Sequence, residues 1–191
     1  VTKGSVKVDG VDVRDMTQKE LRDKLGYVPQ KGVLFSGTID SNIRYGKPEI
    51  TDAQVKEAAE VAQATEFIDT KPEKYESPVS QGGTNVSGGQ KQRLSIARAI
   101  AKDPEIFIFD DSFSALDFKT DSQLRKALKE YTKDATTVIV AQRISTILGA
   151  DQIIVLDDGH MAGIGTHKEL MANCEVYQQI ARSQLSEEEL A

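Results

Sequence analysis

Two short segments of the sequence have residue types and spacings suited to binding a phosphorylated ligand. The first, Val86-Ser-Gly-Gly-Gln-Lys-Gln-Arg93, places two glycines at an expected helix start. Backbone N–H groups at such a start are free to face an anion, and the helix dipole favours negative charge there. The Ser87 hydroxyl would add a donor. The spacing of Ser87 and Gln90 alone indicates only a well-capped helix, but the full SGGQ followed by KQR favours an anion site.

The second segment is Ile106-Phe-Ile-Phe-Asp-Asp111. Its unbroken apolar run predicts a strand buried on both faces, and Asp110 would then lie at the carboxyl edge of the sheet, where open α/β folds bind ligands. A carboxylate at that place can hold Mg²⁺ directly or through water. A lone aspartate there would be an ordinary solvated residue, but Ser114-Ala-Leu-Asp117 follows closely and strengthens the case for a site.

Alternating strand and helix signals precede and follow a helical stretch. Residues 5–13 predict a hairpin about Asp9-Gly10, a capping box at Thr17 predicts a helix to about residue 25, and residues 26–30 predict a short strand. Further elements are expected C-terminal to these: helices after Thr51 and Ser87, a loop at 71–83, a helix with an apolar stripe at Leu124, Leu128 and Tyr131, a buried strand at 136–141, a hairpin at 153–164, and a helical tail from Thr166 with a solvated acidic run at 187–189. This order predicts a mainly parallel sheet with a helical insert.

Composition excludes several functional classes. The 191 residues carry 24 Lys plus Arg against 30 Asp plus Glu, a net charge of −6, which argues against a general nucleic-acid binder. The longest apolar runs are far shorter than the roughly 20 residues that a membrane-spanning helix needs. The lone cysteine, Cys174, excludes an internal disulfide framework and is expected to be a packed hydrophobe.

With these segments together, the chain resembles the nucleotide-binding domain of an ATP-binding cassette (ABC) transporter of the exporter type. Gln30 after Tyr-Val-Pro matches the Q-loop, residues 86–90 the signature motif with Val86 in place of the usual Leu, residues 107–110 the Walker B strand, and residues 114–117 the D-loop. Residues 78–84 resemble the exporter loop before the signature, with Gln81 where Glu is common. The resemblance covers residues 4 to about 185.

The resemblance implies an α/β P-loop NTPase (RecA-like) core that lacks its N-terminal part, made of residues 1–34 and 103–191, with an α-helical signature subdomain inserted at 35–102. It implies binding of ATP and Mg²⁺. Under this resemblance, Asp110 and Gln30 manage Mg²⁺, Asp117 lies at the interface of a nucleotide-bound dimer and caps a helix, and the partner's nucleotide is clamped by Ser87, Gly88, Gly89 and Gln90.

The sequence lacks the motif G-x-x-x-x-G-K-[ST], whose backbone and lysine hold the triphosphate. Its only Gly-Lys pair, Gly46-Lys47, is followed by Pro48. The resemblance places the phosphate loop before residue 1, and the start at Val1 indicates a fragment of a longer protein. We therefore expect the chain alone to bind MgATP weakly and to be inactive.

Two further departures fall on catalytic positions. Asp111 stands where the family usually has the Glu that polarises the attacking water, and its shorter side chain withdraws the carboxylate by about 1 Å. Gln142 stands where a switch His is usual, and an amide cannot titrate as imidazole does. Both changes weaken the same ATP site, so the resemblance implies the degenerate-site subunit of a heterodimeric bacterial exporter, commonly a multidrug exporter.

The implied partners are a second half-transporter subunit and a membrane domain upstream in the same protein, with this segment on the cytoplasmic face of the cell membrane and no nucleic acid bound. A homodimeric exporter that tolerates Asp111 and Gln142, a non-enzymatic ATP-binding subunit, and a soluble ABC ATPase acting on nucleic acid or the ribosome remain alternatives. Residues 34–39 with Asn42 and Ile43 resemble the surface that receives a coupling helix of the membrane domain.

Three other features are expected to need no function. His160 and His167 have no partners at metal-ligand spacing and are interpreted as surface or packing residues. Asp121 and Arg125 are expected to form an exposed i, i+4 helix pair.

Overall fold

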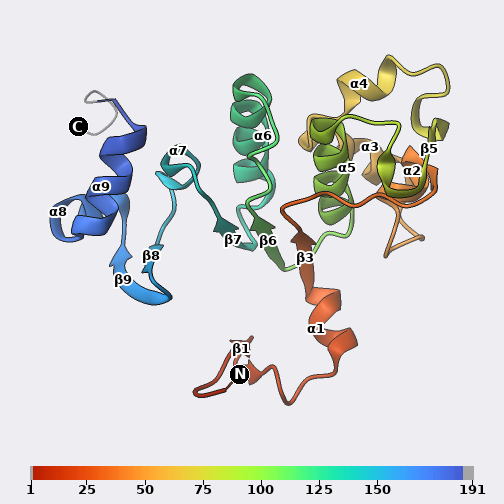
Figure 1. The fold of residues 1–191 in the computed structure, drawn as a ribbon. Helices are drawn as coiled ribbons and strands as arrows, with labels where there is room; N and C mark the ends of the chain where they lie inside the picture. The colour runs from red at the N-terminus through yellow and green to blue at the C-terminus, as the bar shows by residue number, and fades with distance from the viewer. Residues whose placement is uncertain (1, 187–191) are drawn as a thin grey trace. The chain divides into compact units, whose positions relative to one another are not determined.

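The computed structural model describes residues 2–186, and it divides into two compact units, Val1–Val140 and Ala141–Ala191 (Figure 1). The subdivision at 34/35 and 102/103 expected from the family resemblance stays a prediction.

A three-stranded parallel sheet lies at the centre of the first unit. Its strands are β3 (Leu25–Val28), β6 (Ile106–Asp110) and β7 (Thr136–Val140), in the order β3-β6-β7. The register pairs Val28 with Phe109 and Asp110 with Val140, so the carboxyl ends of the strands meet at one edge. Parallel neighbours require crossover connections, and helices supply them here. The parallel sheet expected from the sequence is confirmed.

The N-terminal elements also follow their local signals. Strands β1 (Lys7–Val8) and β2 (Val11–Asp12) form the expected hairpin, and α1 (Gln18–Lys24) begins at a complete capping box on Thr17. The Lys24 ammonium lies 2.8 Å from an Asp9 carboxylate oxygen and 2.7 Å from one of Glu105, so one cation links the hairpin, the helix and the start of β6.

Helices occupy most of the chain between β3 and β6. They are α2 (Ile39–Ile43), α3 (Asp52–Val61), α4 (Thr65–Asp69) and α5 (Gly88–Ala101), with two short 3₁₀ turns, η1 (Lys74–Glu76) and η2 (Gln81–Gly83). The expected capping boxes on Thr51 and Ser87 are both present. A two-stranded sheet of β4 (Gly37–Thr38) and β5 (Pro78–Val79), which the sequence did not indicate, pairs the segment before α2 with the segment after η1.

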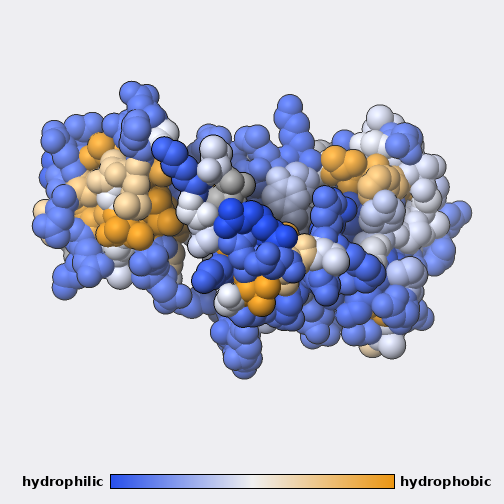
Figure 2. Space-filling model, turned by 90° about the horizontal axis from the view of Figure 1, so that it is seen from below, coloured by the Kyte–Doolittle hydropathy of each residue, from blue (hydrophilic) through white to orange (hydrophobic). Residues whose placement is uncertain are grey.

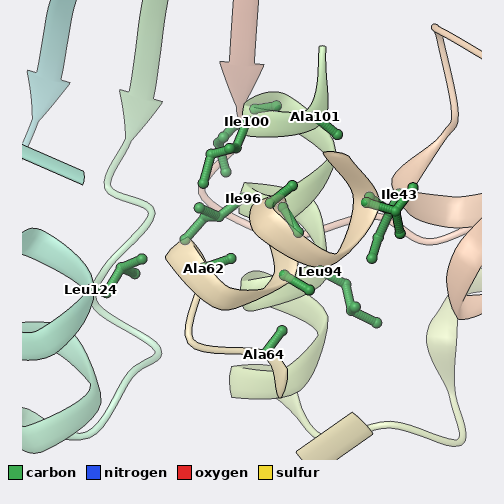
Figure 3. Close-up of a cluster of buried hydrophobic side chains, with 14 of the residues drawn as sticks. Ile43, Ala62, Ala64, Leu94, Ile96, Ile100, Ala101 and Leu124 are labelled. Atoms are coloured by element: carbon green, nitrogen blue, oxygen red, sulfur yellow. The ribbon is translucent and has the colours of Figure 1, made fainter. Parts of the chain in front are cut away.

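The core of the first unit is built around α5. Leu94, Ile96 and Ile100 are at most 1% exposed, and Figure 3 shows them close to Ile43 of α2 and Ala62 after α3. Burying an aliphatic side chain of this size contributes about 1.5–3 kcal/mol. The helix that opens with the signature motif is therefore also the main packing element of its unit.

Helix α6 (Phe118–Tyr131) connects β6 to β7 and carries the expected stripe, with Leu124 and Leu128 buried and Tyr131 partly buried. The expectation of an exposed Asp121–Arg125 pair is wrong. The two side chains do pair, with Nε of Arg125 3.2 Å from Oδ1 of Asp121, but Asp121 is only 2% exposed. It lies on the packed side of α6, one turn before Arg125, so the pair neutralises a buried carboxylate.

The expected burial of the sheet is wrong on one face. Phe107 and Phe109 of β6 pack into the core, whereas Ile106 and Ile108 are half-buried and β7 is mostly exposed. Side chains alternate along a strand, and the described elements of the first unit cover only the face that carries the two phenylalanines. The β-branched composition of β7 alone could not show whether its sheet is covered on one face or on both.

The second unit consists of α7 (Ile144–Ile147), the hairpin β8 (Ile153–Asp157) and β9 (His160–Gly165), and helices α8 (His167–Asn173) and α9 (Glu175–Gln184). The expected hairpin and helical tail are confirmed, while the acidic run at 187–189 lies outside the described residues. Its core contains Val155, Leu170 and Tyr177. Figure 2 shows apolar surface gathered over this unit, where the hairpin exposes Ile154, Leu156, Met161 and Ile164.

Cys174 and the two histidines have the packing and surface roles expected of them. Cys174 is a buried free thiol, His160 is exposed, and Nδ1 of His167 lies 2.8 Å from the buried Tyr177 hydroxyl. Within residues 2–186, no three His, Cys, Asp or Glu side chains gather as a metal site. Over the same residues, no helix is long and apolar enough to cross a membrane.

Candidate functional site

Two aspartates stand at the carboxyl end of β6, next to the end of β3. The Tyr27 hydroxyl donates to Oδ2 of Asp110 across 3.1 Å, and this hydrogen bond raises the pKa of the Tyr27 phenol, since it holds the protonated form beside an anion. The end of β6 therefore presents the Asp110 carboxylate, which accepts a hydrogen bond from one neutral group, the Tyr27 phenol. This is the place where an open α/β sheet binds its ligand.

Asp111 turns the chain sharply away from β6. Its φ is 45°, a left-handed conformation that aspartate tolerates better than most residues, and its backbone N–H donates to the Val140 carbonyl across 2.8 Å. The side chain is largely buried, and Nε2 of Gln30 donates to its Oδ2 across 3.0 Å. The structure thus brings the Q-loop glutamine and the candidate catalytic carboxylate into direct contact.

The two strand ends are also joined by a residue that the sequence analysis missed. Ser112 is fully buried, and its hydroxyl donates to the Val28 carbonyl across 2.8 Å. This bond ties the segment after β6 to the last residue of β3, just before Gln30. No local pattern marks Ser112, because its partner lies 84 positions away in the sequence.

The signature residues form the start of α5. Oγ of Ser87 accepts from the Gln90 N–H across 3.2 Å, and Oε1 of Gln90 accepts from the Ser87 N–H across 3.1 Å. Ser87 and Gly88 are exposed, and no atom lies within 4 Å of the position that a Gly88 Cβ would take. Because the first N–H groups of a helix have no intrahelical partner, this open end offers donors to an anion.

The start of α6 lies beside the start of α5. A Cβ on Gly89 would lie 3.5 Å from the Ala115 carbonyl oxygen, so the signature packs against the D-loop segment. Asp117 caps α6 as expected: its carboxylate accepts from the Thr120 N–H across 3.0 Å, and that bond lowers the pKa of Asp117. The charge of Asp117 also acts on Arg93 of α5, although burial is the larger effect and lowers the pKa of Arg93.

Gln142 lies in the second unit. Its backbone carbonyl accepts from Nε2 of Gln184 across 2.9 Å, while Oε1 of Gln184 accepts from the Ile144 N–H across 2.8 Å. Gln184 of α9 therefore holds the backbone on both sides of Arg143. Sequence reasoning missed this role too, because Gln184 is 42 positions from Gln142.

The residues at the end of β6 suit a nucleotide-bound magnesium ion. Mg²⁺ in such sites takes one or two carboxylates and fills its remaining positions with water and phosphate oxygens. Asp110 supplies a half-exposed carboxylate, and Gln30, whose Nε2 is engaged by Asp111, has an amide oxygen to offer. A single carboxylate with a nearby amide fits this pattern.

The expected coupling-helix surface is only partly at the surface. Leu34, Ile39, Asn42 and Ile43 are buried, so half of the expected residues support the surface from below. Above them, Phe35 and Tyr45 stack with ring centroids 4.2 Å apart, and Tyr45, which sequence reasoning missed, is 56% exposed.

Arg98 of α5 underlies this aromatic pair. Its Nε donates to the Asn42 carbonyl and its Nη1 to the Val33 carbonyl, each across 2.8 Å, and the guanidinium lies over the rings of Phe35 and Tyr45. Burial lowers the pKa of Arg98 to about 10. The surface around Tyr45 is therefore attached to the same helix that carries the signature motif.

Comparisons with known proteins agree with this geometry. The sequence model of the ABC transporter family matches residues 1–114. An uncharacterised ABC transporter ATP-binding protein of Mycobacterium tuberculosis is 47% identical over 187 residues, which are 96% of this chain and 32% of that protein. A Staphylococcus aureus protein, named as a candidate multidrug export ATP-binding/permease protein, is 44% identical over 94% of this chain and 31% of its own length.

Among solved structures, a bacterial Atm1-family ABC exporter with ATP bound superposes with a TM-score of 0.92 at 39% identity, over 97% of this chain and 33% of that chain. The chain thus spans about a third of the length of these relatives. With a family match over more than half of its residues and a mixed α/β fold of the ABC ATPase type, the chain belongs to the ABC transporter family as an ATP-binding domain homologous to those of exporters.

Proposed function

We propose that this chain is the ATPase domain of an ABC exporter whose own nucleotide site is degenerate. The observation that carries the proposal is the contact between Gln30 and Asp111 at the end of β6, beside Asp110. At one edge of the sheet it brings together Gln30 as the γ-phosphate sensor, Asp110 as the magnesium ligand and Asp111 in the position of the catalytic base. The similarity to exporters supports the transport role.

At the chain's own site, Asp110 would hold Mg²⁺ with the amide oxygen of Gln30, and the metal would neutralise charge on the β- and γ-phosphates. Asp111 would orient the attacking water. Its carboxylate is short, largely buried and already accepts a hydrogen bond from Gln30. The acceptor oxygen of a general base must lie about 2.6–3.2 Å from the water oxygen that gives up the proton. The shorter side chain of Asp111 makes it poorly placed for this contact.

From the family resemblance, Gln142 would serve the same ATP site as Asp111, and it would weaken that site for a second reason. Its amide can donate a hydrogen bond to a γ-phosphate oxygen but cannot gain or lose a proton near neutral pH. Asp111 is a shortened group in the position of the base, and Gln142 is a neutral group in the position of the switch histidine. Together they favour a site that holds ATP and hydrolyses it slowly.

The open start of α5 serves a different site. Ser87, Gly88 and Gly89 present a hydroxyl and backbone donors to solvent, where they would clamp the γ-phosphate bound on the Walker face of a second subunit. The signature residues Ser87–Gln90 are intact. We therefore propose a heterodimer in which the partner supplies the better base and this chain supplies the signature.

The surface around Phe35 and Tyr45 would receive a coupling helix of the membrane domain on the cytoplasmic side of the membrane. Because Arg98 attaches this surface to α5, closure of two such domains around ATP would move it, and hydrolysis would release it. In this way nucleotide turnover would drive the membrane helices between two access states, with no role for nucleic acid.

The test is ATP turnover by the full exporter that carries this segment, with its membrane domain and partner. Ser87→Ala should lower kcat about tenfold or more, since the γ-phosphate at the partner's site loses a donor. Asp110→Asn should lower the Mg²⁺-dependent affinity for nucleotide at the chain's own site. Asp134→Asn, an exposed change after α6, is the control for Asp110→Asn and should alter neither quantity. Unchanged turnover in Ser87→Ala would contradict the proposal.

A further inference from the structure

Gln92 is a buried polar residue of α5 whose side chain bonds outside its own helix. It is 2% exposed. Its Nε2 donates to the Pro29 carbonyl across 3.1 Å, and its Oε1 accepts from the Gly32 N–H across 2.9 Å. Both partners are backbone atoms, one just before Gln30 and one just after Lys31. A single amide therefore fixes the backbone on both sides of Gln30 to α5.

The packing at Gly32 independently shows how closely this segment approaches the helix. A Cβ at Gly32 would lie 2.7 Å from Oγ of Ser95 and 3.0 Å from the Lys91 carbonyl oxygen. These distances leave no room for a side chain. The backbone of residues 29–32 thus lies directly on α5, and Gln92 bonds to it at two points.

The same segment is held on its other side by the end of β6. Ser112 donates to the Val28 carbonyl, and the Gln30 side chain donates to Asp111. Residues 28–32 therefore lie between the carboxylates of the chain's own nucleotide site and the helix that carries the signature. A movement of Gln30 toward or away from a γ-phosphate must act on both contacts.

The signature lies about one helical turn from Gln92. Gly88, the first residue of α5, precedes Gln92 by four positions, or about 6 Å of helix rise. Within one hydrogen-bonded turn a helix shifts nearly as a rigid body. A displacement of residues 29–32 that pulls on Gln92 therefore also displaces Ser87 and the N–H groups that follow it.

We propose that Gln92 is a positioning residue that couples the two nucleotide sites in which this chain takes part. Through it, the position of Gln30 at the chain's own Walker face sets the position of Ser87–Gln90 at the partner's Walker face. The inference rests on the proposed function, since it requires that the signature complete a site on a second subunit.

The first arm of the test measures the contact itself, in the full exporter without nucleotide. Gln92→Leu removes both bonds, and Gln92→Glu keeps an acceptor for Gly32 but loses the donor to Pro29. Hydrogen exchange of the backbone amides of residues 30–33, that of Gly32 above all, should quicken about tenfold or more in Gln92→Leu and less in Gln92→Glu. Thr132→Val is the control, because Thr132 is also a buried polar residue, its hydroxyl donates to the Leu128 carbonyl of α6, and it should leave this exchange unchanged.

The second arm is a double-mutant cycle on steady-state ATP turnover. Gln92→Leu should lower kcat about tenfold and change KM for ATP less than twofold, a split that general destabilisation would not produce. Because Gln92 acts through Gln30, the double variant with Gln30→Ala should be no slower than the slower single variant. The cycle of Gln30→Ala with Thr132→Val should show independent effects.

Multiplicative effects of Gln30→Ala and Gln92→Leu, or unchanged amide exchange at residues 30–33, would overturn the inference while leaving the proposed function intact. Absence of turnover in the unmodified exporter would instead count against the proposed function, and the exchange arm would still decide whether Gln92 holds the Q-loop. If Gln92→Leu does not fold, Gln92→Glu takes its place in both arms.

Discussion

At the scale of single residues, the candidate site depends on contacts between groups far apart in the sequence. Asp110 and Asp111 follow a strand whose apolar run is easily recognised, and their position at the end of β6 agrees with the sequence prediction. Their partners could not be predicted in the same way. Ser112 bonds to Val28, and Gln92 to Pro29 and Gly32, and neither serine nor glutamine in these places carries a local signal. Such contacts depend on how elements pack, which periodicity does not encode.

Tyr131 gives a residue-scale prediction for the pH dependence of stability. Burial, together with the nearby charges of Asp103 and Glu57, raises its pKa to about 12 in the folded chain, against about 10 in the unfolded chain. The folded state therefore holds the phenolic proton more tightly. The stabilisation is complete below pH 10 and is lost as the pH rises from 10 toward 12. Thermal unfolding followed by circular dichroism should show Tm falling over this window.

In Tyr131→Phe the fall of Tm between pH 10 and 12 should become shallower, because the group that titrates is gone. The slope of the unmodified chain over the same pH range is the reference. An equal slope in Tyr131→Phe and the unmodified chain would contradict the assignment.

At the scale of elements, helices with local start signals could be predicted and the burial of strands could not. Capping boxes at Thr17, Thr51 and Ser87 mark their helices because each joins residues three positions apart. β7 was expected to be buried because it is β-branched, yet the described elements of the first unit cover only one face of its sheet. Burial of a strand depends on its neighbours, so its own composition gives the wrong result here.

Helix α5 is predicted to be the most sensitive element of the first unit. Leu94 is 0% exposed, and Leu94→Ala should lower the free energy of unfolding by about 2–5 kcal/mol through lost burial and a cavity. Leu156→Ala in β8 makes the same chemical change at a side chain that is 66% exposed and should cost less than about 0.5 kcal/mol. Urea denaturation of both variants measures the contrast, and equal losses would contradict the packing described for α5.

At the scale of the whole molecule, the chain contains a signature and a Walker B strand but no phosphate loop. Its one Gly-Lys pair does not replace that loop: Lys47 follows α2, and its ammonium donates to the Lys102 carbonyl across 3.2 Å. The family and fold could be predicted from the order of the motifs. The division into the units Val1–Val140 and Ala141–Ala191 was not predicted.

The 191-residue chain alone is accordingly predicted to bind MgATP weakly, with a dissociation constant above about 1 mM. The phosphate loop and its lysine supply most contacts to the triphosphate, and Asp110 with Gln30 cannot replace them. Isothermal titration calorimetry should show no saturable heat at submillimolar MgATP, whereas the full exporter should show it. Micromolar binding to the isolated chain would contradict this view of the site.

The central claim, that this chain contributes the weaker of two ATP sites, is tested most directly by restoring the usual catalytic groups. Steady-state ATP turnover would be measured for the full-length subunit without its partner, unmodified and with Asp111→Glu plus Gln142→His, after confirming that both fold. We expect negligible turnover in the unmodified protein and a gain of at least about tenfold in the double variant. Rapid turnover in the unmodified protein, little changed by the two substitutions, would contradict it and favour a homodimeric exporter in which Asp111 and Gln142 suffice.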